Sequence, residues 1–143
     1  IREELVQSGY IRHKGNKKKE KIVSRPLHFI SSDGFDMYVG KNNYQNDELT
    51  FKFATGNDWW FHAKGMPGSH VIVKSENKEL PDSTFEEAGR LAGYYSKGKG
   101  SDKLEIDYLQ KKNVKKPNGA KPGMVIYDYY NTIYVTPKEL KNE

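Results

Sequence analysis

The sequence contains no cysteine among its 143 residues, and it has no long apolar run. Without cysteine the chain cannot be a disulfide-stapled secreted scaffold, and it cannot ligate zinc through thiolates. No hydrophobic stretch approaches the roughly 20 residues of a membrane-spanning helix, and the first residues resemble neither a signal nor a transit peptide. These absences favour a cytoplasmic protein without a membrane partner. Because residue 1 is Ile rather than Met, we expect a piece of a longer chain.

Hydrophobic residues are also scarce, at 35% of the chain, whereas charged residues reach 30%. Ten Tyr, six Phe and two Trp compensate, because an aromatic side chain buries far more area than an aliphatic one. The length fits one compact domain and is too short for two ordinary ones. We therefore expect a single domain with a modest core and a wide polar surface.

The net charge of +5 is unevenly distributed along the chain. Basic residues concentrate in two stretches, 12–25 and 111–121, and the second contains no acid. Acidic residues gather mainly between Glu76 and Glu87. Such segregation indicates a face that binds a polyanion, although two solvated loops would produce the same pattern.

The chain is predicted to divide into three parts. Residues 1–23 read as the end of a coiled-coil helix followed by a Lys-rich linker without apolar periodicity. The compact domain is expected over 24–137, with a short tail at 138–143.

Within the domain, short β-type segments alternate with two helical ones. The last two strands are expected to pair through a tight hairpin at 129–131, and Ser83 with Glu86 is expected to form a capping box. The predicted fold is α+β, a single domain with a largely antiparallel sheet and two helices at about 42–53 and 84–97. The predicted strands are 27–30, 35–39, 58–63, 70–74, 104–108, 124–128 and 132–135.

The densest aromatic cluster lies in the segment 58–62. On a strand, Asp58, Trp60 and His62 share one face, and Trp59 shares the other with Phe61. Trp60 and His62 are therefore candidate base-contacting residues, since stacking of a base on an aromatic ring contributes about 1–3 kcal/mol. In the alternative interpretation both faces are buried and His62 donates to Asp58 or to a backbone carbonyl.

Further candidates for RNA binding lie where backbone amides or lysines are concentrated. The amides and the lysine of 41–43 stand at a predicted helix start, and the Gly-rich turn 65–70 can present N–H groups to a phosphate. Prolines and glycines stiffen the loop 115–123, which reduces the entropy lost when its lysines meet phosphates. The predicted contacts, beyond Trp60 and His62, are Lys41, Asn42, Asn43, Ser69, His70, Arg90, Lys115, Lys116 and Lys121.

Catalysis has weaker support in the sequence. The Gly-rich turn lacks the residue order of a nucleotide P-loop, and adjacent Ser69 and His70 would point in opposite directions on a strand. A metal-dependent nuclease built on Asp58, His62, His70 and Glu87 remains an alternative. Our prediction is a module with no catalytic residue, no metal and no cofactor.

Four ordered segments resemble the R module of the NFACT family, whose members are also known as fibronectin-binding protein A in Gram-positive bacteria. The segments are 40–47, 58–62, 67–72 and 114–123, and the resemblance covers the chain from about residue 24 to residue 137. One departure is that Trp60 and Phe61 stand where aliphatic residues are common in the family.

The resemblance implies an RNA-binding module of a ribosome quality control factor. Such a factor binds the large ribosomal subunit and tRNA and supports C-terminal alanine tailing of stalled nascent chains, with the peptide bond made by the ribosome. The module itself would not be an enzyme. A fibronectin-binding adhesin domain at the cell surface is the alternative that the family's second name suggests.

Overall fold

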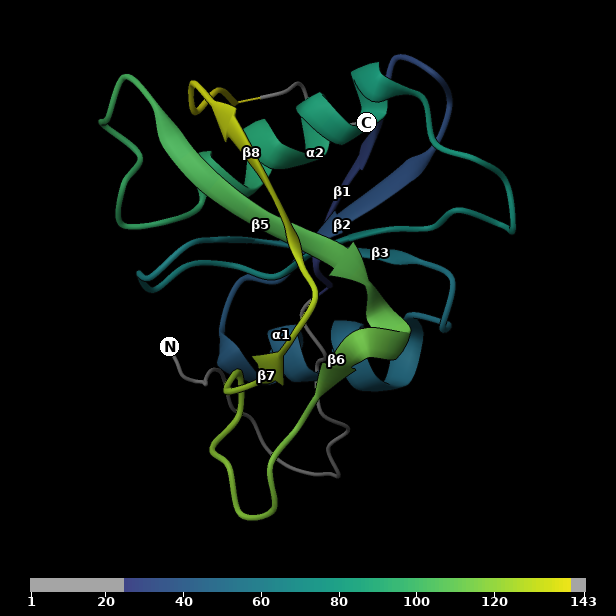
Figure 1. Cartoon of the computed structure of the whole chain (residues 1–143), viewed down its shortest axis with the longest axis vertical. Helices are drawn as coiled ribbons and strands as arrows, with labels where there is room; N and C mark the ends of the chain where they lie inside the picture. Colours follow the sequence, from purple (N-terminus) through teal and green to yellow (C-terminus); the bar gives the residue numbers. More distant parts are fainter. Residues whose placement is uncertain (1–24, 140–143) are drawn as a thin grey trace, which may run out of the picture.

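The computed structural model describes residues 25–139. Its centre is a six-stranded antiparallel sheet with the strand order β1-β2-β4-β3-β5-β8 (Figure 1). This arrangement confirms the predicted α+β fold with a largely antiparallel sheet. The strands of the sheet are β1 Leu27–Ile30, β2 Asp36–Val39, β3 Trp59–Ala63, β4 Val71–Val73, β5 Leu104–Gln110 and β8 Asn131–Val135.

Helices cover both faces of this sheet, as Figure 1 shows, with α2 above the strands and α1 below them. Helix α2 spans Asp82–Tyr94, and α1 spans Asn43–Glu48 and continues into a π-helix, η1, at Leu49–Phe53. Below the sheet lies a second, two-stranded sheet formed by β6 (Val114–Lys115) and β7 (Ile126–Tyr127). None of the helices in 25–139 has the length and apolar character that crossing a membrane requires.

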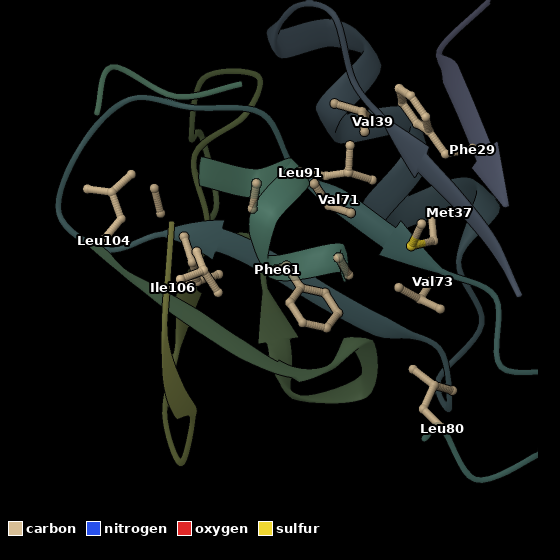
Figure 2. Packing of buried hydrophobic residues seen from close by; sticks show 14 residues of the cluster. Phe29, Met37, Val39, Phe61, Val71, Val73, Leu80, Leu91, Leu104 and Ile106 are labelled. Atoms are coloured by element: carbon tan, nitrogen blue, oxygen red, sulfur yellow. The ribbon is translucent and has the colours of Figure 1, made fainter. Parts of the chain in front are cut away.

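The alternation of side chains along β3 explains why the core has two parts. Phe61 faces α2 and is buried with Val71 and Leu91, a packing visible in Figure 2. Trp60 points to the opposite face and is buried with Leu49 of η1 and Val114 of β6. Burying a side chain such as Phe or Leu contributes about 1.5–3 kcal/mol each. The sheet is therefore fixed from both sides, and the second face positions α1 and the loop after β6.

The predicted hairpin at 129–131 is wrong. Strand β7 pairs with β6, and β8 instead joins the main sheet by pairing with β5. Tyr129, in the left-handed region at φ 57°, redirects the chain between the two sheets, and its side chain is 95% exposed. Alternation predicted both strands but could not tell which partner each would take.

The predicted capping box is also wrong. Helix α2 begins at Asp82 with Pro81 at its N-cap, so Ser83 and Glu86 both lie inside the helix. The Ser83 hydroxyl donates instead to Asp33 in the β1–β2 turn, and the Thr84 hydroxyl donates to the same carboxylate at 2.7 Å. These bonds attach the helix to the sheet rather than cap it.

The boundaries of both helices differ from the prediction. Helix α2 ends at Tyr94, before the predicted limit of 97. The first helix changes its hydrogen bonding halfway, and the Ala54 N–H donates to the Leu49 carbonyl five residues back at 2.9 Å. The predicted coiled-coil end and Lys-rich linker lie outside the described residues.

Candidate nucleic-acid interface

The loop between β2 and α1 holds three of the predicted site residues, Lys41, Asn42 and Asn43, and all three are exposed. Asn42 caps α1 by accepting a hydrogen bond from the Gln45 backbone N–H at 2.9 Å. The Lys41 backbone N–H donates to the Gln45 side-chain oxygen at 2.8 Å. The loop is thus held by its own hydrogen bonds, and within residues 25–139 the Lys41 ammonium has no carboxylate partner.

Asn46 of α1 joins this loop to the turn that precedes β4. Its side chain is 3% exposed, and its Oδ1 accepts a hydrogen bond from the His70 backbone N–H at 3.0 Å. The Gly40 N–H donates to the His70 carbonyl at 3.2 Å. A Cβ atom at Gly40 would lie 2.1 Å from Asn46 Oδ1, so only glycine fits there. Two of the predicted segments, 40–43 and 67–70, are therefore held side by side.

His70 lies beneath this surface rather than on it. It is 2% exposed, and its Nδ1 is 2.8 Å from the Thr50 hydroxyl of η1. The ring also interacts with the Gly123 backbone. Burial, with a contribution from nearby His62, outweighs the opposing effect of this interaction and lowers the pKa of His70 to about 3. The ring is consequently neutral at physiological pH and fastens β4 to both η1 and the loop after β6.

The free energy of unfolding is expected to fall as the pH drops below 6.5, because of this histidine. An unfolded chain, with the ordinary His pKa of 6.5, takes up a proton that folded His70 does not take until about pH 3. The unfolded state then binds more protons, so stability decreases by up to about 1.4 kcal/mol per pH unit in that window. Urea unfolding across pH measures the slope, which should flatten in His70→Gln. A folded-state NMR titration of His70 near pH 6.5 would contradict this assignment.

The loop 115–123 is anchored on α1 through Asp47. This carboxylate accepts hydrogen bonds from the Gly123 N–H at 2.8 Å and from the Lys116 ammonium, which lies 3.0 Å from its nearer oxygen. Lys116 also donates to the Lys121 carbonyl at 2.9 Å, which closes the loop on itself. Lys116 is therefore a structural cation, whereas Lys115 and Lys121 are exposed and have no ion pair within the described residues. Figure 1 shows this loop between β6 and β7, below the sheet.

The end of α2 contributes a fourth segment, 94–97, that the sequence analysis did not include. The Ser69 N–H donates to the Tyr95 carbonyl at 2.9 Å, and the Lys97 N–H donates to the Pro67 carbonyl at 3.0 Å. A lysine followed by glycine at a helix end is so common that Lys97 carried no special signal. A groove of about 630 Å³ runs between these segments, and its polar lining includes Lys41, Asn42, Asn43, Ser69, Tyr94 and Lys97.

Trp60 and His62 lie on the face of β3 that is turned towards the β6–β7 pair. Trp60 is 1% exposed, and its ring packs 5.0 Å from that of Tyr127 and 5.1 Å from that of His70. His62 is partly buried, and its ring interacts with the Gly68 backbone. Burial lowers the pKa of His62. The structure agrees with the interpretation in which this face of β3 is buried, and Trp60 serves to support the loop above it.

The remaining predicted residues do not join the groove. Arg90 lies on α2, paired with Glu86 one turn earlier. The four residues of the nuclease alternative have separate roles: Asp58 pairs with Lys74 at 2.6 Å, and Glu87 accepts hydrogen bonds from Ser32. Within residues 25–139, no three His, Asp or Glu side chains gather where they could hold a metal ion.

The comparison with protein families matches residues 25–128 to the "NFACT protein RNA binding domain". Among curated proteins, the chain is 46% identical over 140 residues to the Rqc2 homolog RqcH of Bacillus subtilis. It is 43% identical over 142 residues to the Rqc2 homolog RqcH of Streptococcus suis. These alignments cover 96% and 99% of this chain but only 24% and 25% of the relatives, so the chain spans about a quarter of their length.

A solved structure resembles the fold closely. The C-terminal part of the fibronectin/fibrinogen-binding protein of Streptococcus suis superposes with a TM-score of 0.80 and 42% sequence identity. The match covers 96% of this chain and 55% of the other. The overall fold is therefore shared with a protein of related sequence.

Proposed function

The chain belongs to the NFACT RNA-binding domain family, and we propose that it binds RNA phosphates at the groove described above and on the adjoining loop 115–123. Lys41 and Lys97 flank the groove, with Asn42, Asn43 and Ser69 as hydrogen-bonding groups along it. Lys115 and Lys121 extend the surface onto the loop. In this proposal Lys116, His70 and Trp60 act from beneath, because each holds a segment of the surface in place.

The proposal depends on one observation, that among the described residues some lysines of this surface form ion pairs with carboxylates and others do not. Four exposed lysines from distant parts of the sequence lie on segments that contact one another, and none has an ion-pair partner within residues 25–139. The acid that anchors the loop, Asp47, is already paired with Lys116. Cations left without partners on a pre-formed surface gain the most from a polyanion. The four lysines are Lys41, Lys97, Lys115 and Lys121.

We further propose that the RNA belongs to the large ribosomal subunit and to tRNA. The RqcH relatives are named as homologues of Rqc2, and the Drosophila melanogaster relative is named as a homologue of a ribosome quality control complex subunit. Within a longer protein, this module would contribute binding while C-terminal alanine tails are added to stalled nascent chains. In this proposal the groove contacts phosphate, and the ribosome makes the peptide bonds.

Binding of tRNA and of large-subunit RNA should weaken steeply with salt. Each neutralised phosphate lowers the slope of log K against log salt by about 0.7–0.9, so four lysines predict a slope of about −3 to −4. Fluorescence anisotropy at several salt concentrations measures it. An affinity that stays almost constant from low to physiological salt would rule out phosphate binding at this surface.

Binding of fibronectin is a second candidate, supported by the name of the Streptococcus suis protein with the similar structure. Immobilised fibronectin can be tested with the same protein samples. Saturable fibronectin binding that is unchanged when Lys41, Lys97, Lys115 and Lys121 are replaced by alanine would favour a separate, protein-binding role. Fractionation of cells that make the full-length protein would then decide whether it reaches the surface.

A further inference from the structure

A second groove, of about 1020 Å³, lies on the other side of Asn42 from the first. It runs between the β1–β2 edge of the sheet and the α1–η1 segment. Its lining includes four ring-bearing side chains, two cationic side chains and one acid, Glu48. The rings belong to His28, Tyr38, Tyr44 and Phe53, and the cations to Arg25 and Lys52.

A fixed stack of rings forms one wall of this groove. His28 and Tyr38 are direct partners across the β1–β2 pair, and their rings stack 4.6 Å apart with planes only 10° from parallel. His28 Nε2 is 2.7 Å from an oxygen of Asp36, which orients the imidazole. The ring of Phe53 meets Tyr38 edge-on at 4.8 Å. Tyr38 is thus enclosed, whereas the His28 side chain at the end of the stack keeps 38% of its surface exposed.

Opposite this wall, α1 presents Tyr44, which is 72% exposed. Arg25 is exposed and has no ion pair within residues 25–139, whereas Lys52 pairs with Glu48 at 3.5 Å. Tyr44 and His28 therefore line the same groove with exposed ring surface, and contiguous exposed apolar surface marks ligand-binding grooves. The flat, nearly parallel rings favour a planar ligand.

The two grooves share Asn42 in their linings, so a strand bound along the first can reach the second past this residue. Bases of single-stranded RNA stack readily on His and Tyr rings, and adjacent cations contact the backbone phosphates. An apolar peptide would also fit the rings. It would gain nothing, however, from Arg25 or from the neighbouring groove that Lys41 and Lys97 line. The charge and the position of the second groove therefore favour RNA.

We propose that this groove binds an unpaired RNA base, which stacks on His28 beside Tyr44 while Arg25 contacts the neighbouring phosphate. This inference rests on the proposed RNA-binding function and adds a preference for single-stranded over duplex RNA. The first groove, lined by Lys41 and Lys97, supplies affinity for the RNA backbone. The second groove, lined by His28 and Tyr44, distinguishes an unpaired RNA strand from an RNA duplex.

The test uses residues 1–143 and a short single-stranded RNA carrying 2-aminopurine, with a duplex of the same length for comparison. His28→Ala with Tyr44→Ala should lower affinity for the single strand by about fivefold to a hundredfold, with the salt slope unchanged. The quenching of 2-aminopurine on binding should disappear. His28→Phe, which keeps a flat ring but loses the bond to Asp36, should retain more affinity for the single strand than His28→Ala does. Tyr134→Ala is the matched control, since Tyr134 is a 62% exposed tyrosine on edge strand β8.

The possible failures can be told apart. If the double variant binds the single strand as tightly as wild type while loss of the groove lysines weakens binding, the base site is refuted and the proposed function stands. An equal loss of affinity for single strand and duplex would also refute the base site. If neither set of variants changes RNA binding, the proposed function fails as well. Peptide binding with unchanged RNA affinity would assign the groove to a protein partner.

Discussion

Replacement of Lys41, Lys97 and Lys121 together by alanine is expected to lower RNA affinity about a hundredfold at physiological salt. Each lysine is exposed and comes from a different segment of the proposed surface. Three lost phosphate contacts should reduce the slope of log K against log salt by about 2–3, which near 0.15 M corresponds to roughly two orders of magnitude. Anisotropy titrations with tRNA and with large-subunit RNA measure both the affinity and the slope.

The matched control removes the same charge from elsewhere. Lys78 comes after the end of β4, and Lys112 comes after the end of β5. At these ends Val73 and Gln110 both pair with Trp59. His70 precedes the opposite end of β4. Lys103 lies over the ring of Tyr134 at the β8 edge. All three are exposed, so alanine there should change binding by only a few fold. Equal losses in the two triple variants would show a response to net charge alone and would remove the reason for placing RNA at the groove.

The strands could largely be predicted because local patterns determine them, whereas their partners could not. Trp60 and Phe61 alternate in a way that places them on opposite faces wherever β3 lies in the sheet. The local sequence, in contrast, does not show whether β7 and β8 pair with each other or with different strands. Their partners depend on how Tyr127 and Ile133 pack against residues far away in the sequence. Tyr127 of β7 packs against Trp60 on one face of the main sheet. Ile133 of β8 packs with the core on the other face.

Three of the four segments of the candidate site were predicted from the sequence, but the roles of their residues and the segment 94–97 were not. Lys115 and Lys116 are indistinguishable as neighbours in a basic loop. The fold pairs Lys116 with Asp47, 69 residues away, and leaves Lys115 exposed. His70 likewise had the chemistry of a base contact, and burial against Thr50 makes it a structural link. Charge and glycine content thus predicted most segments of the proposed surface, and long-range contacts determine which of its cations have no ion pair within the described residues.

Gly40→Ala is expected to reduce the free energy of unfolding by about 2–4 kcal/mol, because overpacking and a broken buried hydrogen bond add together. The new methyl group would lie 2.1 Å from Asn46 Oδ1 and 3.0 Å from the Asn46 backbone nitrogen. Asn46 would have to release the buried His70 N–H, which would leave that donor without its acceptor. Urea unfolding of the two proteins at neutral pH measures the difference.

Gly100→Ala is the control, because a Cβ atom there meets nothing within 4 Å and the change should be close to neutral. A double-mutant cycle separates the mechanism from a general intolerance of the loop. In an Asn46→Ala background the obstructing amide is gone, so Gly40→Ala should be markedly less destabilising than in wild type. Equal destabilisation in both backgrounds would show that Asn46 is not the obstacle. The loop and the turn would then be held together by some contact other than this amide, and the groove between them would need another account of its rigidity.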